Sequence, residues 1–343
     1  MPAGFELSPS TAGEYLQEWG VIPEEASPTA RTLGGGVSNR VIAVEWDEGC
    51  LVAKQPLPNL AVEDDWPADV ARVHNEAAAT RAYSEVISGA SLDARAPGLV
   101  FEDTDEHVIA IECAPEGADT WKAELLSGHV DPEIARAVGA VLGAVHSEAA
   151  GDDELRETFA SELPFEQLRL DPYHRTTARR HPDVREEIEA ETERVEGTAR
   201  TLVHGDYSPK NVLVDRADSP AVPWILDFEV AHWGDPAFDA AFMCNHLFIK
   251  SVYNHERHSE YVDAALGFWD AYDARVPWAI ESETVAELGV LMLARVDGKS
   301  PVEYVTEEAT ADALRRIAKR TLRGEVGSLE GFADLAREEA DAL

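Results

Sequence analysis

Hydrophobic and polar positions form short alternating runs in the first third of the chain and take on helical spacing after it. Between Thr32 and Pro56, β-branched and apolar residues form runs that the turn residues 47–49 separate, a pattern that predicts strands. Residues 68–87 are rich in alanine and contain neither proline nor glycine, so we expect a helix there. Two short apolar runs, 99–101 and 107–111, predict two more strands.

Residues 112–117 interrupt this pattern with a proline and a glycine, and helical spacing prevails after them. Asp131 and Pro132 form a helix-start signal that apolar residues at helical spacing follow. Residues 151–200 are polar and are predicted to be helical, with a break near 171–174. Short strand patterns return at 202–203, 212–214 and 224–226, and the remainder is mostly helical.

A sheet-rich front followed by a helix-rich back indicates an α+β fold of two lobes. We expect residues 1–113 to form an N-terminal nucleotide-binding lobe with an antiparallel sheet plus a helix. Residues 114–343 are expected to form a mostly helical C-terminal lobe that carries the catalytic and substrate-binding residues. The 343 residues are enough for two such lobes.

The charge of the chain is strongly negative, with 66 acidic and 29 basic residues and a formal net charge of -37. A field of this sign repels nucleic acid and anionic membranes, so we exclude both as partners. Eight tryptophans and the regular apolar periodicity nevertheless indicate a folded protein. We hypothesise that the protein comes from a halophile, whose salt-rich cytosol screens the repulsion between acidic side chains.

Cys50, Cys113 and Cys244 are odd in number and far apart in the sequence. This usage predicts a reducing compartment and no disulfide framework. The first residues lack the basic and apolar regions of a signal peptide, and no apolar run approaches the length of a membrane span. We therefore expect a soluble, cytoplasmic protein.

Three short motifs follow one another at predicted strand ends. They are a His-Gly-Asp motif that ends at Asp206 and is followed by Asn211, an Asp-Phe-Glu motif that starts at Asp227, and Gly-Asp-Pro-Ala-Phe-Asp at 234–239. Phosphoryl transfer needs a carboxylate aimed at the acceptor hydroxyl and oxygen ligands that hold Mg²⁺ on the phosphates. Asp206 fits the first role, and Asn211 and Asp227 fit the second. Each motif alone could be a turn or a strand end, but all three in this order favour a catalytic site.

These motifs resemble those of the aminoglycoside phosphotransferase and choline kinase superfamily, whose members share the protein-kinase fold. The resemblance implies that Asp206 is the catalytic base and that Asn211 and Asp227 bind metal. It also implies that ATP and Mg²⁺ take part in the reaction. The segment 234–239 resembles the one that braces the catalytic loop, so Asp239 is expected to be a buried acceptor for loop N–H groups. A buried structural role is also expected for His204.

The front half offers candidates for nucleotide binding. Lys54 lies on a predicted strand, at the place of the lysine that holds the α- and β-phosphates. Glu76 on the helix predicted at 68–87 is the candidate ion-pair partner of this lysine, and a solvated position, like that of Glu85, is the alternative.

A glycine-rich turn and the lobe boundary complete the nucleotide site. Gly35 and Gly36, followed by Ser38, could let backbone N–H groups approach phosphate. The same residues could equally form a simple hairpin turn. By analogy with the fold, the backbone from Glu112 to Ala114 is the expected adenine-binding hinge.

The acceptor is expected to be a small molecule. Only four residues separate Glu229 from Gly234, which leaves no room for the long activation segment of a protein kinase. Several segments resemble methylthioribose kinases: residues 54–58, 66–67, 72–76, 120–128 and 170–173.

The chain also departs from the methylthioribose kinases. That family usually lacks the amide at Asn211 and has Asp-Pro-Glu where this chain has Asp-Phe-Glu. The resemblance implies that Glu229 joins Asp227 at the metal, and an exposed strand-end charge is the alternative. The paired arginines of that family correspond to a single one here, Arg295, which Lys299 follows.

Arg295 and Lys299 are candidate substrate-binding residues. Two cations suit a sugar that bears a phosphate, whereas surface pairing with Asp297 or Glu303 is the alternative. The sequence therefore predicts an ATP-dependent kinase of a ribose-type sugar or sugar phosphate, such as methylthioribose or ribose 1-phosphate. An aminoglycoside or amino-alcohol phosphotransferase and an inactive nucleotide-binding relic are the alternatives. The acceptor hydroxyl, the nucleotide preference and the oligomeric state, a homodimer included, stay open.

Overall fold

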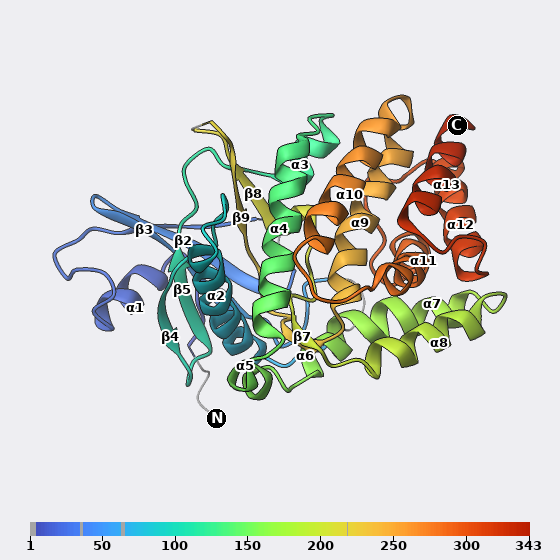
Figure 1. Ribbon diagram of the computed structural model, residues 1–343. Helices are drawn as coiled ribbons and strands as arrows, with labels where there is room; N and C mark the ends of the chain where they lie inside the picture. The colour runs from blue at the N-terminus through green and yellow to red at the C-terminus, as the bar shows by residue number, and fades with distance from the viewer. Residues whose placement is uncertain (1–4, 35–36, 63–65, 218) are drawn as a thin grey trace.

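The computed structural model describes residues 5–34, 37–62, 66–217 and 219–343. Its N-terminal part is a five-stranded antiparallel sheet in the order β1-β2-β3-β5-β4 (Figure 1). The strands are β1 (Thr29–Thr32), β2 (Asn39–Trp46), β3 (Gly49–Pro56), β4 (Leu99–Asp103) and β5 (Val108–Glu112).

Helix α2 (Arg72–Gly89) packs on this sheet through Val73 and Ala77 against Ile109 and Ile111. It begins four residues after the predicted start, because Ala68 N donates a backbone hydrogen bond to Pro58 O at 3.1 Å and joins the neighbouring loop. The predicted strands and helix of this half are confirmed. Helix α1 (Ala12–Glu18), which covers the other side of the sheet, was not predicted.

The expectation that no cysteine forms a disulfide is wrong. Cys50 and Cys113 are bonded, with their Cα atoms 5.7 Å apart. The register of the sheet explains the pairing, because Leu51 lies opposite Glu112 in the antiparallel pair of β3 and β5, and the cysteines occupy the adjoining positions on the two strands. Cys244 is a free buried thiol.

The C-terminal part is mostly helical, and helix α9 (Pro236–Tyr253) lies at its centre with nearly every residue buried. Figure 1 shows α9 among the other long helices, with α2 and α4 side by side where the two parts of the chain meet. The remaining helices are α3 (Trp121–Leu126), α4 (Pro132–Ala149), α5 (Asp153–Thr158), α6 (Leu163–Phe165), α7 (Thr176–Arg180), α8 (Arg185–Glu196), α10 (His258–Asp273), α11 (Glu281–Asp297), α12 (Glu308–Leu322) and α13 (Leu329–Asp341).

The predicted helix start at Asp131 is confirmed, since its side chain accepts a hydrogen bond from Glu133 N at 3.0 Å.

Short strands and turns carry the motifs of this half. The short elements are β6 (Asp119–Thr120), β7 (Thr201–Val203), β8 (Val212–Asp215), β9 (Val222–Ile225), β10 (His232–Gly234) and the 3₁₀ turns η2 (Pro209–Asn211) and η3 (His255–Arg257).

The break predicted at residues 171–174 is absent, and a π-helix, η1 (Glu166–Arg175), runs through Pro172 instead. A proline cannot donate the hydrogen bond of an α-helical turn, and the wider turn accommodates it. The predicted fold class, an α+β fold like that of the protein kinases, is confirmed. The lobe boundary after residue 113 stays a prediction. Among the described helices, none combines the length and the apolarity that crossing a membrane requires.

Candidate active site

The loop between β7 and β8 carries Asp206, and a side chain of α9 accepts hydrogen bonds from the backbone of this loop. Gly205 has a φ of 75°, and a Cβ atom there would lie 2.6 Å from Val230 O, so both conformation and space require glycine. Asp239 in the first turn of α9 accepts hydrogen bonds from His204 N at 2.6 Å and Gly205 N at 2.9 Å. The carboxylate lies where the sequence placed the acceptor for the loop N–H groups.

His204 connects the loop to the neighbouring strand end. Its Nε2 lies 3.1 Å from Leu226 O, and its Nδ1 accepts from Asp206 N at 3.2 Å. Burial lowers the pKa of His204 and keeps the ring neutral. A neutral ring with a proton on Nε2 satisfies both contacts, which agrees with the expected structural role.

The carboxylate of Asp206 is buried among three polar side chains. Asn211 Nδ2 donates to Asp206 Oδ2 at 2.8 Å, and Lys210 Nζ lies 2.8 Å from the same oxygen. Arg169 Nη2, from helix η1, lies 2.7 Å from Asp206 Oδ1. Burial alone would raise the pKa of Asp206, but the charges of Arg169 and Lys210 outweigh it and hold the pKa well below its ordinary value. Asp206 is therefore ionised at neutral pH.

Lys54 brings the sheet to the same site. Its Nζ forms an ion pair with Glu76 Oε1 from α2 and lies 3.4 Å from Asp227 Oδ1. Glu76 is buried, so it is not the solvated side chain that was the alternative. Burial would lower the pKa of Lys54, but Glu76 and Asp227 raise it above its ordinary value and keep the ammonium charged. Asp227 adopts a left-handed backbone, with φ at 70°.

Glu229 is buried and faces the N-terminal part of the chain, so the alternative of an exposed charge is wrong. Its Oε2 accepts from Arg72 Nε at 2.9 Å and from Asn39 Nδ2 at 3.0 Å. Arg72 Nη2 also donates to Ser38 O at 2.6 Å. Arg72 therefore connects α2, the loop before β2 and the end of the Asp-Phe-Glu motif. The metal-binding role of Glu229 stays a prediction.

The remaining nucleotide candidates are placed only in part. Gly35 and Gly36 lie outside the described residues. Ser38 lies next to Asn39, whose Nδ2 is 3.3 Å from Ser38 Oγ. Glu112 ends β5, and its side chain accepts from Gly98 N at 2.9 Å, while Ala114 follows in the segment that leads into the helical part. Their roles at adenine stay predictions.

The donors at the site fit one Mg²⁺ ion held together with phosphate oxygens. Within the described ranges, no three His, Cys, Asp or Glu side chains gather into a metal site. Asn211 turns its Nδ2 to Asp206, which leaves its Oδ1 as an acceptor, and its backbone O accepts from Leu226 N, the residue before Asp227, at 2.9 Å. One carboxylate and one amide oxygen are a usual protein contribution, because Mg²⁺ takes its other ligands from substrate phosphates and water.

A model of the phosphotransferase enzyme family (APH) matches residues 29–278, a range that includes Lys54, Asp206 and Asp227. The chain belongs to this family. It is thus a phosphotransferase, and the enzyme predicted from the motifs is confirmed at that level. It is 22% identical over 278 residues to a methylthioribose kinase of Bacillus cereus, covering 74% of this chain and 68% of the relative.

Solved structures show the same fold. An amicoumacin kinase bound to AMP-PNP and Ca²⁺ has a TM-score of 0.53 at 12% identity, covering 92% of this phosphotransferase and 95% of that chain. A GDP complex of a mutant aminoglycoside 2'-phosphotransferase-IIIa has a TM-score of 0.51 at 12% identity, with 98% of each chain covered. An ethanolamine kinase of Plasmodium vivax has a TM-score of 0.50 at 11% identity, covering 96% and 87%.

The phosphotransferase places Arg295, one of the two substrate candidates, near Asp206. Arg295 Nη1 donates to Tyr173 OH at 3.2 Å, and its guanidinium carbon lies 5.7 Å from the centre of the Tyr173 ring. Arg169 lies 5.5 Å from the same ring. Arg295 and Arg169, the arginine that contacts Asp206, therefore both lie close to the same tyrosine ring.

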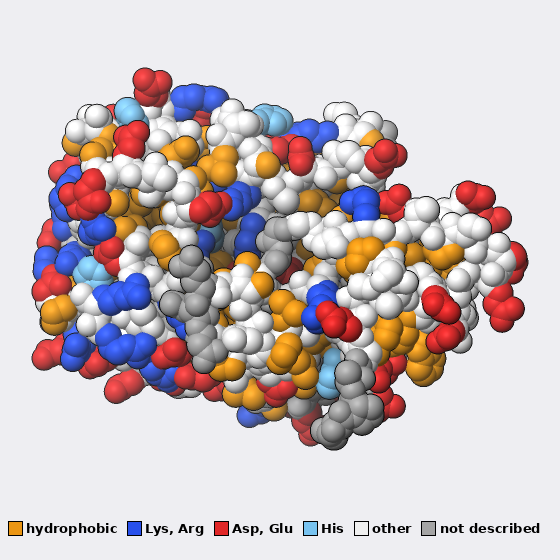
Figure 2. Space-filling view, turned by 180° about the vertical axis from the view of Figure 1, so that it is seen from behind, with side chains coloured by type: hydrophobic (Ala, Val, Ile, Leu, Met, Phe, Trp, Pro, Cys, Tyr) orange, Lys and Arg blue, Asp and Glu red, His pale blue; other side chains and the backbone are white. Residues whose placement is uncertain are grey.

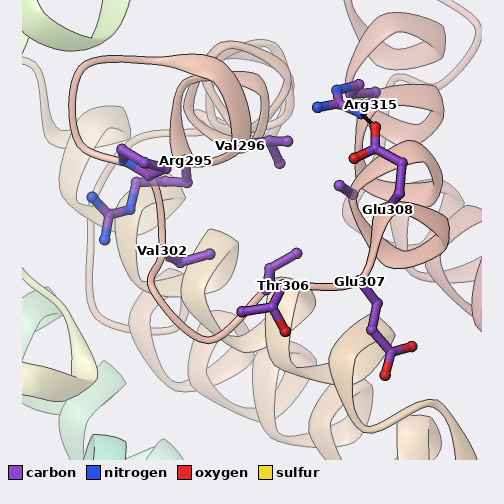
Figure 3. A pocket seen from close by; sticks show the side chains of 10 residues that line it. Arg295, Val296, Val302, Thr306, Glu307, Glu308 and Arg315 are labelled. Atoms are coloured by element: carbon purple, nitrogen blue, oxygen red, sulfur yellow. Dashed lines mark hydrogen bonds and ion pairs between the residues drawn. The ribbon is translucent and has the colours of Figure 1, made fainter.

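Arg295 also borders a surface pocket between the end of α11 and the start of α12, lined by Val296, Val302, Thr306 and Glu308. Figure 3 shows the guanidinium of Arg295 pointing away from that pocket. The pocket is therefore not the acceptor site that Arg295 was predicted to serve.

Lys299, the other candidate, lies with its Nζ 4.6 Å from the centre of the Trp66 ring. Trp66 Nε1 in turn donates to Gln167 O in η1 at 2.8 Å. Surface pairing of Lys299 with Asp297 or Glu303 was the alternative. These two carboxylates have other partners, Arg315 and Lys122.

Sequence reasoning missed Arg169 and Arg72 as parts of the site. Arg169 directly precedes the segment 170–173 that resembles methylthioribose kinases, and Arg72 opens the segment 72–76. The resemblance of these segments was a signal that could have pointed to both arginines.

Proposed function

We propose that this phosphotransferase is an ATP-dependent kinase of a ribose-type sugar or sugar phosphate. The observation that carries the proposal is the buried Asp206, held ionised by Arg169 and Lys210 and adjoining the Lys54–Asp227 contact that links the two parts of the chain. A carboxylate aimed at an acceptor, next to a lysine for phosphates, is the arrangement that phosphoryl transfer needs. An inactive relic would have no need to retain it.

In the mechanism we propose, Lys54 binds the α- and β-phosphates, and Glu76 fixes the direction of its ammonium group. Asp206 orients the acceptor hydroxyl and takes its proton as the oxygen attacks the γ-phosphorus. The new O–P bond forms as the bond to the β–γ bridging oxygen breaks, and ADP leaves with that electron pair. Asn211 and Asp227 would hold Mg²⁺, which neutralises charge on the phosphates when bound.

Two observations support the choice of acceptor: the positive charges near Asp206 and the substrate that a relative of the chain is named for. The methylthioribose kinase of Bacillus cereus supports a ribose-type acceptor. Arg169 and Arg295, which both lie close to the Tyr173 ring, support an acceptor with an anionic group. An aminoglycoside is a polycation, which these arginines would repel, so we place that activity and amino-alcohol phosphorylation second.

The test is ATP consumption with Mg²⁺ in molar KCl against ribose, methylthioribose, ribose 1-phosphate, ribose 5-phosphate, kanamycin and choline. We expect turnover with at least one ribose derivative, and a loss of about 10³-fold or more in the Asp206→Asn variant. Asp334→Asn, the same chemical change at an exposed position on α13, is the matched control. Turnover that survives Asp206→Asn, or turnover with kanamycin alone, would contradict the proposal.

The location belongs to the same proposal. We place the kinase in the cytoplasm, where ATP is available, with a small molecule as its partner and no nucleic acid or membrane. The acidic surface supports both exclusions. The homodimer stays open.

A further inference from the structure

Helix α9 carries a stripe of side chains that starts beside the catalytic loop. Phe242, His246 and Lys250 are four residues apart and so lie on one face of the helix. The ring of Phe242 lies parallel to that of Tyr173, with 5.9 Å between the ring centres. The guanidinium of Arg169, which contacts Asp206, lies 5.6 Å from the same ring of Phe242. The stripe therefore leads from the catalytic carboxylate into the helical part.

Lys250 is fully buried at the far end of this stripe. Its Nζ lies 3.2 Å from His246 O and 3.4 Å from Tyr304 OH, and no described carboxylate is within ion-pair distance of it. Burial lowers the pKa of Lys250 to about 7, and the nearby charges of Lys122 and Arg295 act in the same direction. A buried ammonium with neutral partners is costly, and an anionic ligand would remove that cost.

Two more nitrogen-bearing side chains next to Lys250 have unused donors. The ring nitrogens of His246 form no hydrogen bond with any described residue, and the ring lies edge to face with that of Phe242. Arg295 uses Nη1 for Tyr173 and Ser300, whereas its Nε is buried without a hydrogen-bond partner among the described residues. The charges of Lys250 and Arg295 act on His246, and that of Arg295 acts on Lys250 as well, so these three groups belong together electrostatically and have no described anion as a partner.

The positive charge at this place contrasts with the rest of the molecule. The chain has 66 acidic residues and only six lysines, yet the charges of Lys122, Lys210 and Lys250 all act on His246. The negative charge that raises the pKa of Lys250 is that of Glu303, and Glu303 is ion-paired to Lys122 instead. Figure 2 shows basic side chains inside a hollow near the middle of a face that elsewhere carries acidic, basic and hydrophobic side chains.

We propose that Lys250, His246 and Arg295 form a subsite for a phosphate group on the acceptor, so that the enzyme phosphorylates a sugar that already is a phosphate monoester. This inference rests on the proposed kinase function and narrows its acceptor. A dianionic phosphate takes charge-assisted hydrogen bonds from all three groups. The phosphate also supplies a negative charge next to Lys250, where this otherwise acidic protein has no carboxylate within ion-pair distance among the described residues.

The first experiment compares kcat/KM for ribose 1-phosphate and for ribose in the wild type and in Lys250→Met, which keeps the length and apolar stem of the side chain. We expect the ratio of the two values to fall by about 10- to 100-fold, the loss of one hydrogen bond to a charged group. Lys319→Met, on the surface of α12, is the matched control and should keep the ratio. A ratio that stays within about twofold in Lys250→Met would overturn the subsite.

A second variant guards against misfolding. If Lys250→Met loses its thermal transition, Arg295→Met must produce the same fall in the ratio. An unchanged ratio in a folded Arg295→Met protein would overturn the proposal as well.

The second experiment measures binding without turnover and separates the subsite from the kinase function. Calorimetry with the Asp206→Asn protein should show ribose 5-phosphate or ribose 1-phosphate binding at least about tenfold more tightly than ribose, a preference that Lys250→Met removes. Such binding with no kinase activity in the wild type would overturn the proposed function and keep the subsite. Turnover of unphosphorylated ribose, together with no preference for ribose phosphates in binding, would overturn the subsite and keep the proposed kinase function. Inorganic phosphate serves as a further probe. If it binds as tightly as the sugar phosphates do, and no sugar phosphate competes with it, the subsite does not serve the acceptor and the proposal is overturned.

Discussion

Arg169 Nη2 lies 2.7 Å from Asp206 Oδ1, and Arg169 Nε donates to Gly205 O at 2.7 Å. One guanidinium thus contacts both the carboxylate of Asp206 and the backbone of the loop that carries it. It comes from the π-helix η1, which is distant from the loop in the sequence. The planar guanidinium of Arg directs several donors at once, so Arg169 fixes the position of the loop as well as supplying a charge.

Replacing Arg169 by Met should impair catalysis in a pH-dependent way. Asp206 loses the main charge that opposes its burial, so its pKa rises and the acidic limb of the kcat/KM profile moves to higher pH. We expect kcat/KM at neutral pH to fall about 100-fold, and Arg169→Lys to recover part of the loss. The measurement is the pH dependence of kcat/KM.

The same substitution should also change stability with pH. A carboxyl whose folded pKa is depressed stabilises the protein above its unfolded pKa, and that contribution is lost as pH falls. The destabilisation by Arg169→Met should therefore be largest at neutral pH and shrink below about pH 4. An unchanged kinetic profile together with unchanged stability would show that Arg169 does not control Asp206.

The buried pair of Lys54 and Glu76 should behave as a coupled unit. Lys54→Met leaves Glu76 buried without its partner, and we expect the free energy of unfolding to fall by about 3–5 kcal/mol. Adding Glu76→Gln should restore much of that stability, whereas kcat/KM for ATP stays at least about 100-fold low in both proteins, because the phosphate contact is gone. Urea unfolding and steady-state kinetics are the measurements.

Lys319→Met provides the comparison for the buried pair. Lys319 pairs with Asp183 at 2.9 Å on the surface, so its loss should cost less than about 1 kcal/mol. Additive effects of Lys54→Met and Glu76→Gln would contradict the coupling.

Glu287 should make the protein less stable as pH rises. It is fully buried next to His174, with Oε1 3.0 Å from Nε2, and burial raises its pKa to about 8. The native state therefore keeps a proton that the unfolded state loses above about pH 4.3, and the contribution of this group falls by up to about 1.4 kcal/mol per pH unit up to pH 8.

Glu287→Gln removes this titration. The free energy of unfolding of the variant, relative to the wild type, should increase between pH 5 and pH 8. Glu256→Gln, an exposed change, should give a constant difference. A difference for Glu287→Gln that does not depend on pH would contradict the raised pKa.

The acidic surface should make stability depend on salt. The formal net charge is -37, and the Debye length falls from about 30 Å at 0.01 M salt to about 3 Å at 1 M. We expect the urea midpoint and the melting temperature to rise steadily with KCl over this range. Equal stability in dilute buffer and in molar KCl would end the hypothesis of a halophilic protein.

The local pattern was sufficient to predict much of the fold. The strands around Lys54, the helix that carries Glu76 and the short strands beside Asp206 were read from periodicity and turn residues, because these signals act over a few neighbouring residues. Pairings over long distances were not predictable. The Cys50–Cys113 disulfide depends on the register of β3 against β5, and a proline inside η1 was read as a break because local rules favour one.

The sequence by itself determined the motifs, the order of the elements and the family, since these lie in contiguous residues. The tertiary structure alone decided which cations surround Asp206 and which buried groups lack a counter-charge. Arg169, Arg295 and Lys250 come from three different helices. Electrostatic interaction depends on distance in space and on burial, and neither quantity is written in the spacing of residues along the chain.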